Sequence, residues 1–162
     1  MIKKVLCVCK GNGDRSPMMT AVLQMYLEQS FKLVGQMSEA KLEQGFKKAV
    51  LCESAGILEI ANKGGGASPL MIEAAKRIGI DLSSHKRRWV NSLNINDYDL
   101  FVCVDDEVAA YLIMELGVDM KKVCNAQISN AWPSRFQRDL DDTAERIMGA
   151  MFRVVTRYFS PE

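Results

Sequence analysis

The sequence has little of what marks several large classes of protein. Its 162 residues include one histidine, four prolines and 7% aromatic residues, and 21 Lys and Arg nearly balance 20 Asp and Glu. Because no global excess of positive charge is present, we expect neither a nucleic-acid partner nor a membrane partner. No apolar run approaches a membrane-spanning length, and the N-terminal residues lack the apolar core and cleavage site of a signal peptide.

Metal and disulfide chemistry also have little support. The cysteines are odd in number, and most stand in apolar runs, which suits a reducing cytosol better than a disulfide framework. They are Cys7, Cys9, Cys52, Cys103 and Cys124. Their spacing does not resemble a zinc site, and His85 is the only histidine. We therefore expect a cytoplasmic protein that needs no metal and no other cofactor.

Short apolar segments alternate with helical patterns along the chain. Strands are predicted at residues 5–8, 49–54, 99–104 and 122–126, and helices at 16–30, 38–48, 68–78, 107–116 and 138–158. Gly35 is expected to break the first helical pattern, and Gly79 is expected to follow the helix at 68–78. This order predicts an α/β fold, with residues 1–162 forming a single three-layer domain: a four-stranded parallel sheet with helices on both faces.

The stretch from Val5 to Pro17 carries the most information about function. Its apolar run stops at Cys9, residues 11–13 demand a turn, and Ser16 with Pro17 suits a helix N-cap and first turn. Such a loop, placed after the first strand, directs backbone N–H groups and the positive end of a helix dipole at one point, which binds anions. The predicted phosphate-binding residues are Lys10, Gly11, Asn12, Gly13, Asp14, Arg15 and Ser16.

Cys9 and Arg15 flank this loop and indicate phosphoryl transfer to sulfur. A helix N-terminus and a nearby guanidinium favour the thiolate, which is the nucleophilic form of cysteine. Arg15 would hold two phosphate oxygens while the loop amides bind the rest, and no metal is required. The pair alone is weak evidence, but its position between a strand end and a helix start strengthens it.

The chain resembles the low-molecular-weight protein tyrosine phosphatases, which share their architecture and loop with thioredoxin-linked arsenate reductases. The resemblance rests on Cys9-x-Gly-Asn-x-x-Arg-Ser-Pro17, Glu53-Ser-Ala-Gly56, the segment from Gly79 to Arg88 and the segment from Tyr98 to Asp105. It implies that Cys9 is the nucleophile, Arg15 the phosphate clamp and Ser16 the hydroxyl that hydrogen-bonds the thiolate. It also implies that Ser54 and His85 support Asn12 in a left-handed turn, whereas by themselves they would suggest turn capping and a buried histidine.

The sequence departs from this family at the general acid. The family has an Asp-Pro pair on a late loop, but here Trp132 precedes Pro133, and indole cannot supply a proton. Losing a general acid typically costs 10²- to 10⁴-fold in rate. Asp139, Asp141 and Asp142 are alternatives, although capping of the last helix explains them more simply, so the general acid stays unassigned.

A second departure lies within the loop. The family often has an apolar residue and a cysteine where this chain has Gly13 and Asp14. Because a carboxylate would repel a bound phosphate, we expect Asp14 to point outward, toward a cation. The cations of residues 86–88 are expected to form a solvated face.

These features give three hypotheses about function. The first is a cysteine-dependent phosphatase that hydrolyses phosphotyrosine or small aryl phosphates through a thiophosphate intermediate on Cys9, with a phosphorylated protein or small phosphate ester as its partner. The second is a phosphate- or phosphoprotein-binding module with impaired catalysis. The third is an arsenate reductase, for which Cys103 is the most plausible resolving cysteine. A dinucleotide-binding turn matches only in part, and the Walker signature is absent.

Overall fold

The computed structural model describes residues 1–37 and 50–160, so the helix predicted at 38–48 lies outside the described residues. Its strands form one parallel sheet in the order β2-β1-β3-β4. They are β1 (Lys4–Cys9), β2 (Leu51–Gly56), β3 (Leu100–Cys103) and β4 (Val123–Asn125). This arrangement confirms the predicted α/β fold with a four-stranded parallel sheet.

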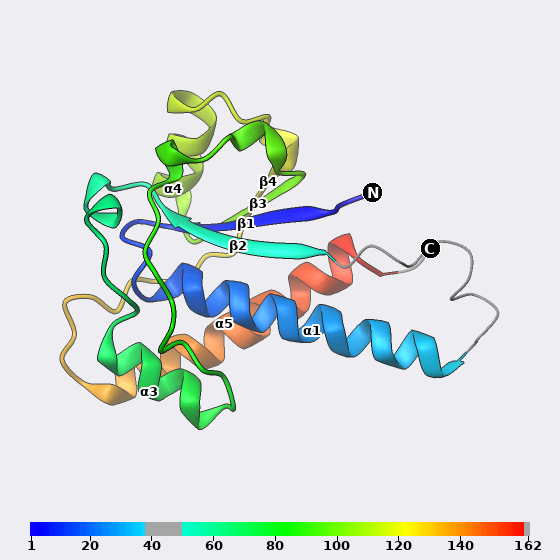
Figure 1. Ribbon diagram of the computed structural model, residues 1–162, viewed down its shortest axis with the longest axis horizontal. Helices are drawn as coiled ribbons and strands as arrows, with labels where there is room; N and C mark the ends of the chain where they lie inside the picture. Colours follow the sequence, from blue (N-terminus) through cyan, green and yellow to red (C-terminus); the bar gives the residue numbers. More distant parts are fainter. Residues whose placement is uncertain (38–49, 161–162) are drawn as a thin grey trace.

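Helices cover both faces of the sheet (Figure 1). They are α1 (Arg15–Met37), α3 (Pro69–Arg77), α4 (Asp106–Ala110) and α5 (Gln137–Tyr158). The first and last pack together beneath the sheet with α3 beside them, and α4 lies on the opposite side (Figure 1). A π-helical turn, Tyr111–Glu115, continues α4. Within residues 1–37 and 50–160, no helix is both long and apolar enough to cross a bilayer.

The central strand explains why the sheet is buried. Residues Val5–Cys9 of β1 have strands on both sides and are at most 3% exposed. The apolar stripe predicted for the last helix also faces the core, through Leu140, Ala144, Ile147 and Met151, and Val154 is buried there where the prediction had Val155. Fully burying an aliphatic side chain contributes about 1.5–3 kcal/mol, so these two elements carry much of the core.

The first helix differs from its prediction at both ends. It begins at Arg15, so Ser16 is its second residue and not its N-cap. Pro17 is accommodated in the first turn, where backbone N–H groups have no intrahelical acceptor. The helix also continues through Gly35 to Met37, because a glycine costs only about 1 kcal/mol relative to alanine in a helix and does not by itself end one.

Other predicted boundaries of helices and strands lie closer to those in the structure. Ser68 is the N-cap of α3, and Gly79 follows the C-cap residue of that helix with a φ of 81°. Asp105 caps α4 by accepting a hydrogen bond from the Val108 N–H at 2.9 Å. The second strand extends two residues past the predicted end at Ser54, because Gly56 still pairs with Cys9 of the central strand.

Candidate active site

The loop of residues 10–14 lies where the carboxyl ends of the central strands meet. In the sheet register Cys9 pairs with Gly56, and Val8 pairs with Cys103. Gly56 lies so close to the loop that a Cβ atom there would be 2.5 Å from the Lys10 carbonyl oxygen. A side chain at residue 56 would therefore displace the loop backbone.

Asn12 organises the interior of this loop. It is fully buried, with a φ of 56°, in the left-handed region that asparagine tolerates better than most residues. Its Nδ2 donates to the hydroxyls of Ser16 and Ser54 at 2.8 and 2.9 Å, and its Oδ1 accepts from the Arg88 N–H at 2.8 Å. Its carbonyl oxygen lies 2.8 Å from Nε2 of His85. Three segments of the chain, the start of α1, β2 and residues 85–88, thus fix one turn.

The sulfur of Cys9 lies inside the same network. The Asn12 N–H donates to Sγ at 3.2 Å, and the Ser16 hydroxyl lies 3.0 Å from Sγ. The side-chain Nδ2 of Asn12 donates to the Ser16 oxygen. The Ser16 hydroxyl can therefore direct its own proton toward the sulfur. Both contacts would stabilise a thiolate. Ser16, which the sequence predicted to be an N-cap, therefore contacts the Cys9 sulfur.

Arg15 is held by the segments that follow β3 and β4. The residue is 3% exposed, and its Nη1 donates to the Ile128 carbonyl oxygen at 2.8 Å and to Oδ2 of Asp105 at 3.3 Å. Both contacts use one nitrogen of the guanidinium. The geometry fixes the plane of the group before any anion binds.

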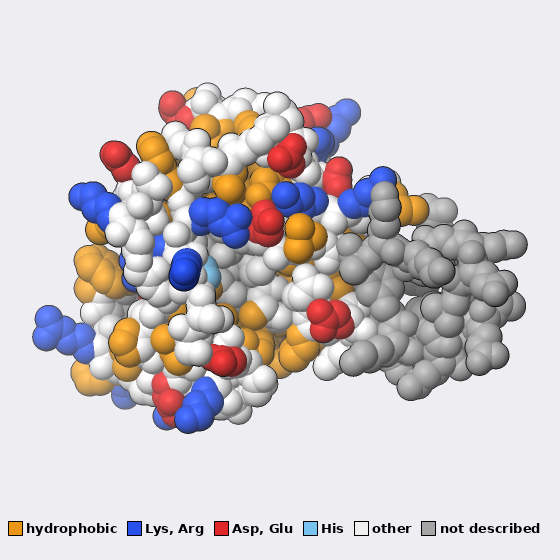
Figure 2. Space-filling model, in the orientation of Figure 1, with side chains coloured by type: hydrophobic (Ala, Val, Ile, Leu, Met, Phe, Trp, Pro, Cys, Tyr) orange, Lys and Arg blue, Asp and Glu red, His pale blue; other side chains and the backbone are white. Residues whose placement is uncertain are grey.

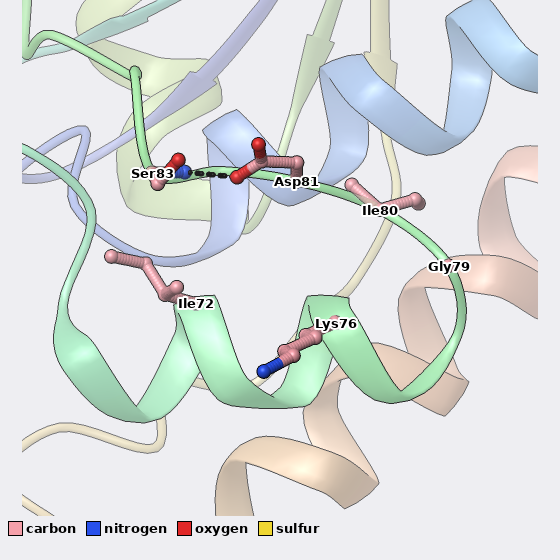
Figure 3. A pocket seen from close by; sticks show the side chains of 6 residues that line it. All are labelled: Ile72, Lys76, Gly79, Ile80, Asp81 and Ser83. Atoms are coloured by element: carbon pink, nitrogen blue, oxygen red, sulfur yellow. Dashed lines mark hydrogen bonds between the residues drawn. The ribbon is translucent and has the colours of Figure 1, made fainter.

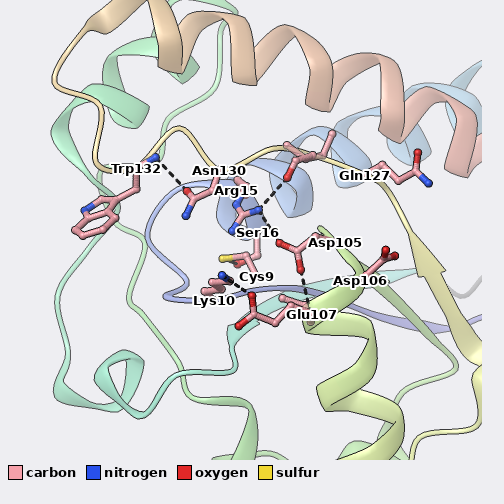
Figure 4. Close-up of polar contacts among 12 residues, drawn as sticks. Cys9, Lys10, Arg15, Ser16, Asp105, Asp106, Glu107, Gln127, Asn130 and Trp132 are labelled. Atoms are coloured by element: carbon pink, nitrogen blue, oxygen red, sulfur yellow. Dashed lines mark hydrogen bonds and ion pairs between the residues drawn. The ribbon is translucent and has the colours of Figure 1, made fainter.

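Two carboxylates at the loop were missed as site residues by the sequence interpretation. Asp105 binds Arg15, and Oε2 of Glu107 lies 2.6 Å from Nζ of Lys10 (Figure 4). Both follow β3, which neighbours β1 in the sheet. The rule that carboxyl ends of parallel strands meet at one edge is the signal that could have placed them here.

The segment around Gly13 and Asp14 corrects two predictions. Asp14 does not reach a cation: its Oδ1 accepts a hydrogen bond from the hydroxyl of Ser68, the N-cap of α3. Residues 86–88 are not simply a solvated face either. The Arg87 guanidinium packs against Gly13, and Arg88 lies 3.7 Å from Glu53.

Trp132 lies on the segment that follows Ile128 and is 73% exposed, to one side of Cys9 in Figure 4. Of the three aspartates considered as replacements for the general acid, Asp142 is exposed and the other two are engaged elsewhere. Asp139 accepts a hydrogen bond from the Ser134 hydroxyl, and Asp141 forms an ion pair with Arg77 of α3. These contacts fasten the start of α5 and give neither carboxylate a contact with the loop.

Three buried thiols and the histidine have shifted pKa values. Burial raises the pKa of Cys52 and of Cys103 to about 12, and burial also raises the pKa of Cys7 well above its usual range. These cysteines therefore stay protonated at neutral pH. Burial lowers the pKa of His85, although the hydrogen bond from its ring to the Asn12 carbonyl acts in the opposite direction.

A separate hollow lies between α3 and the segment that follows it (Figure 3). Its lining residues are Ile72, Lys76, Gly79, Ile80, Asp81 and Ser83. None of them belongs to the loop, and Asp81 only accepts a local hydrogen bond from the Ser83 N–H. No group of three or more His, Cys, Asp or Glu side chains within residues 1–37 and 50–160 is arranged to hold a metal ion.

Comparison with known proteins decides the family. The model of the family described as low molecular weight phosphotyrosine protein phosphatase matches residues 4–145. The chain belongs to this family. Membership places it among the protein tyrosine phosphatases, and the resemblance inferred from the loop and its supporting segments is confirmed. No curated protein sequence matches the chain.

Solved structures of phosphatases share this fold. Wzb of Vibrio vulnificus, in complex with benzylphosphonate, is 21% identical, with 97% of this chain and 99% of that chain covered and a TM-score of 0.78. A low molecular weight protein tyrosine phosphatase of T. tengcongensis is 21% identical over 96% and 99%, with a TM-score of 0.75. Wzb of Escherichia coli K30, in complex with sulphate, is 17% identical over 97% and 99%, with a TM-score of 0.76.

Proposed function

We propose that the protein hydrolyses phosphotyrosine or small aryl phosphates through a thiophosphate intermediate on Cys9. The observation that carries the proposal is the placement of the sulfur between the Asn12 N–H and the Ser16 hydroxyl, at the start of α1. A thiolate there is stabilised by two hydrogen bonds and by the helix dipole. The backbone N–H groups of the loop and the guanidinium of Arg15 form a site for a tetrahedral anion.

The first chemical step transfers the phosphoryl group. The Cys9 thiolate attacks phosphorus and forms an S–P bond, the bond from phosphorus to the ester oxygen breaks, and the leaving group departs as an alkoxide or phenolate that takes its proton from solvent. Charge spread over the three equatorial oxygens is stabilised by Arg15 and the loop amides. In the second step water attacks phosphorus and releases a proton to solvent, the S–P bond breaks, inorganic phosphate leaves, and the Ser16 hydroxyl stabilises the regenerated thiolate.

The leaving-group proton is the demanding part of this mechanism. Trp132 cannot donate it, and Asp14 of the loop accepts a hydrogen bond from Ser68. The nearby carboxylates of Asp105 and Glu107 are paired with Arg15 and Lys10. The enzyme is therefore expected to favour esters whose leaving group departs without a proton. Turnover of p-nitrophenyl phosphate should exceed that of phenyl phosphate by a factor of 10² or more, the range set by a general acid.

The test compares wild type with Cys9→Ser. Turnover of p-nitrophenyl phosphate by wild type, its loss in the variant, and a phosphoryl group trapped on Cys9 by rapid acid quench would support the proposal. Cys124→Ser is the matched control because Cys124 lies on β4, away from the loop, and should keep full activity. Activity retained by Cys9→Ser would contradict the mechanism.

The exposed Trp132 favours a second candidate, a phosphate- or phosphoprotein-binding module with impaired catalysis. Its mark would be binding of phosphopeptide by wild type without turnover of any aryl phosphate. Arsenate reduction has less support, because burial and a pKa of about 12 make Cys103 a poor resolving thiol. The five cysteines, all free in the structure, suit the reducing cytoplasm, which stays our prediction for the location.

A further inference from the structure

Arg87 occupies space that the phosphate loop leaves open. A Cβ atom on Gly13 would lie 2.8 Å from Nη2 of Arg87, so any larger residue at 13 would displace the guanidinium. On its other side, Nε of Arg87 donates to the carbonyl oxygen of Gly66 at 2.9 Å. The Arg87 N–H also donates to the Gly65 carbonyl at 2.9 Å. The guanidinium is thus held against the loop by glycine backbone.

Charge balance separates Arg87 from the other cations around the loop. Lys10 lies 2.6 Å from Glu107, Arg15 lies 3.3 Å from Asp105, and Arg88 lies 3.7 Å from Glu53. In the part of the chain that the structure describes, Arg87 forms no ion pair. Its one side-chain hydrogen bond there goes to a neutral carbonyl and uses one of five N–H donors.

The molecular surface near the loop also carries positively charged side chains. On the face shown in Figure 2, blue Lys and Arg side chains lie beside the pale-blue histidine that supports the loop. Arg87 is partly exposed, so its remaining donors can meet a ligand. A partly buried guanidinium without a carboxylate partner is suited to a carboxylate or phosphate on the substrate.

We propose that Arg87 is a specificity-determining residue that binds a second anionic group of the substrate, beside the phosphoryl group held by the loop. This inference rests on the proposed phosphatase function. Because the guanidinium touches Gly13 of the loop itself, the two anions must be near neighbours. The substrate class that fits two neighbouring anions is a phosphotyrosine peptide with an acidic side chain flanking the phosphorylated residue.

The experiment uses two phosphotyrosine peptides that differ only in their flanking residues, Asp in one and Asn in the other. For wild type we expect the KM of the acidic peptide to be lower by about 10-fold, the effect of one charge-assisted hydrogen bond. Arg87→Gln keeps a donor for the Gly66 carbonyl but loses the charge, and should bring the KM ratio to about one. Arg87→Lys keeps the charge and should preserve most of the preference.

The matched control is Lys86→Ala, which removes an exposed cation next to Arg87. It should leave the KM ratio unchanged. A structural role of Arg87 would alter both peptides alike and leave the ratio as in wild type, because the peptides share the same phosphoryl group. An unchanged ratio in Arg87→Gln, or an equal loss in Lys86→Ala, would overturn the proposal.

Two further measurements keep the outcomes separate. A peptide with a second phosphate in place of the flanking aspartate tests whether the favoured anion is a phosphate: tighter binding than the Asp peptide would overturn the carboxylate assignment. If wild type turns over no peptide, the proposed phosphatase function fails only when p-nitrophenyl phosphate is not hydrolysed either. The Arg87 inference is then decided by calorimetric affinities of Cys9→Ser and Cys9→Ser/Arg87→Gln for the two peptides, with the same expected ratios.

Discussion

Two neighbouring segments of the site are built in opposite ways. In the loop of residues 9–16, Asn12 is fully buried and all its polar side-chain atoms have partners from distant parts of the chain. The segment from Ser129 to Phe136 presents Trp132 and Phe136 at 73% and 62% exposure. Its hydrogen bonds run mainly to close neighbours, such as the Trp132 N–H to Asn130 at 3.1 Å.

The contrast teaches that anion binding and leaving-group chemistry are separable here. Ile128 connects the two segments, because its carbonyl oxygen accepts the hydrogen bond from Arg15 just before the exposed segment begins. The loop has little freedom to change at Asn12 and Ser16, since a substitution there leaves a buried polar group without a partner. The exposed segment can change sequence at little cost in stability. A shared family loop can therefore coexist with a missing Asp-Pro pair.

The largest effect should come from breaking the loop at Asn12. Asn12→Ala removes three side-chain hydrogen bonds and places a Cβ at a positive φ without them, so we expect a loss of about 3 kcal/mol in unfolding free energy and about 100-fold in kcat/KM. Asn12→Gly tolerates the same φ and separates strain from lost bonds. Denaturant unfolding and steady-state kinetics measure both; an active, stable Asn12→Ala enzyme would refute this account of the loop.

The second-largest effect should come from placing a general acid at residue 132. Trp132→Asp recreates the Asp-Pro pair of the family and should raise kcat for phenyl phosphate by about 10- to 100-fold, with a small change for p-nitrophenyl phosphate. Trp132→Asn has nearly the same shape without the proton and should give no gain. Stability should move by less than about 0.5 kcal/mol, because the side chain is mostly exposed. Equal gains with both variants would show that shape, not proton transfer, is responsible.

A smaller effect is expected when Trp132 is truncated. Trp132→Ala should raise KM for aryl phosphates by about 3- to 10-fold through the loss of apolar contact, while the melting temperature stays within error. Met114→Ala is the control, since Met114 is 79% exposed on the turn after α4. A KM that does not change would place the aryl group elsewhere.

The smallest effect is a pH dependence from His85. Burial holds the pKa of His85 below its usual value of 6.5, so the unfolded chain binds a proton more readily than the folded one. The contribution to stability is complete above about pH 6.5 and is lost as the pH falls through the folded-state pKa. His85→Gln can still donate to the Asn12 carbonyl and should flatten the fall in unfolding free energy between pH 7.5 and 5. An equal slope in both proteins would speak against this role.

Local sequence carried the prediction of β1, the loop and the start of α1, because strand, turn and helix signals follow one another within about fifteen residues. The same local signals misplaced the helix start: Ser16 and Pro17 look like a cap and first turn, but the helix begins one residue earlier. Gly35 misled in the same way. Propensity is a weak guide where the rest of the helix is intact.

Contacts between distant segments could not be read from the chain. Asp14 binds Ser68, 54 residues away, and Arg87 fills the space beside Gly13. From charge alone, Asp14 was predicted to point toward a cation and Arg87 toward solvent. Neither prediction could take into account that residues 64–68 pass beside the loop. The clustering of Asn12, Ser54 and His85 was anticipated only through the family resemblance.

The contacts of Asn12 also link anion occupancy to the unfolding equilibrium. An anion that binds only the folded loop stabilises the native chain by RT ln(1 + [L]/Kd), about 2.7 kcal/mol when free phosphate exceeds its Kd 100-fold. The turn is hydrogen-bonded to β2 through Ser54 and to the segment after α3 through His85 and Arg88. Anion binding therefore raises the free energy of global unfolding. Phosphate buffer would thus act as a folding ligand, and a melting curve recorded in it would hide part of the cost of a damaged loop.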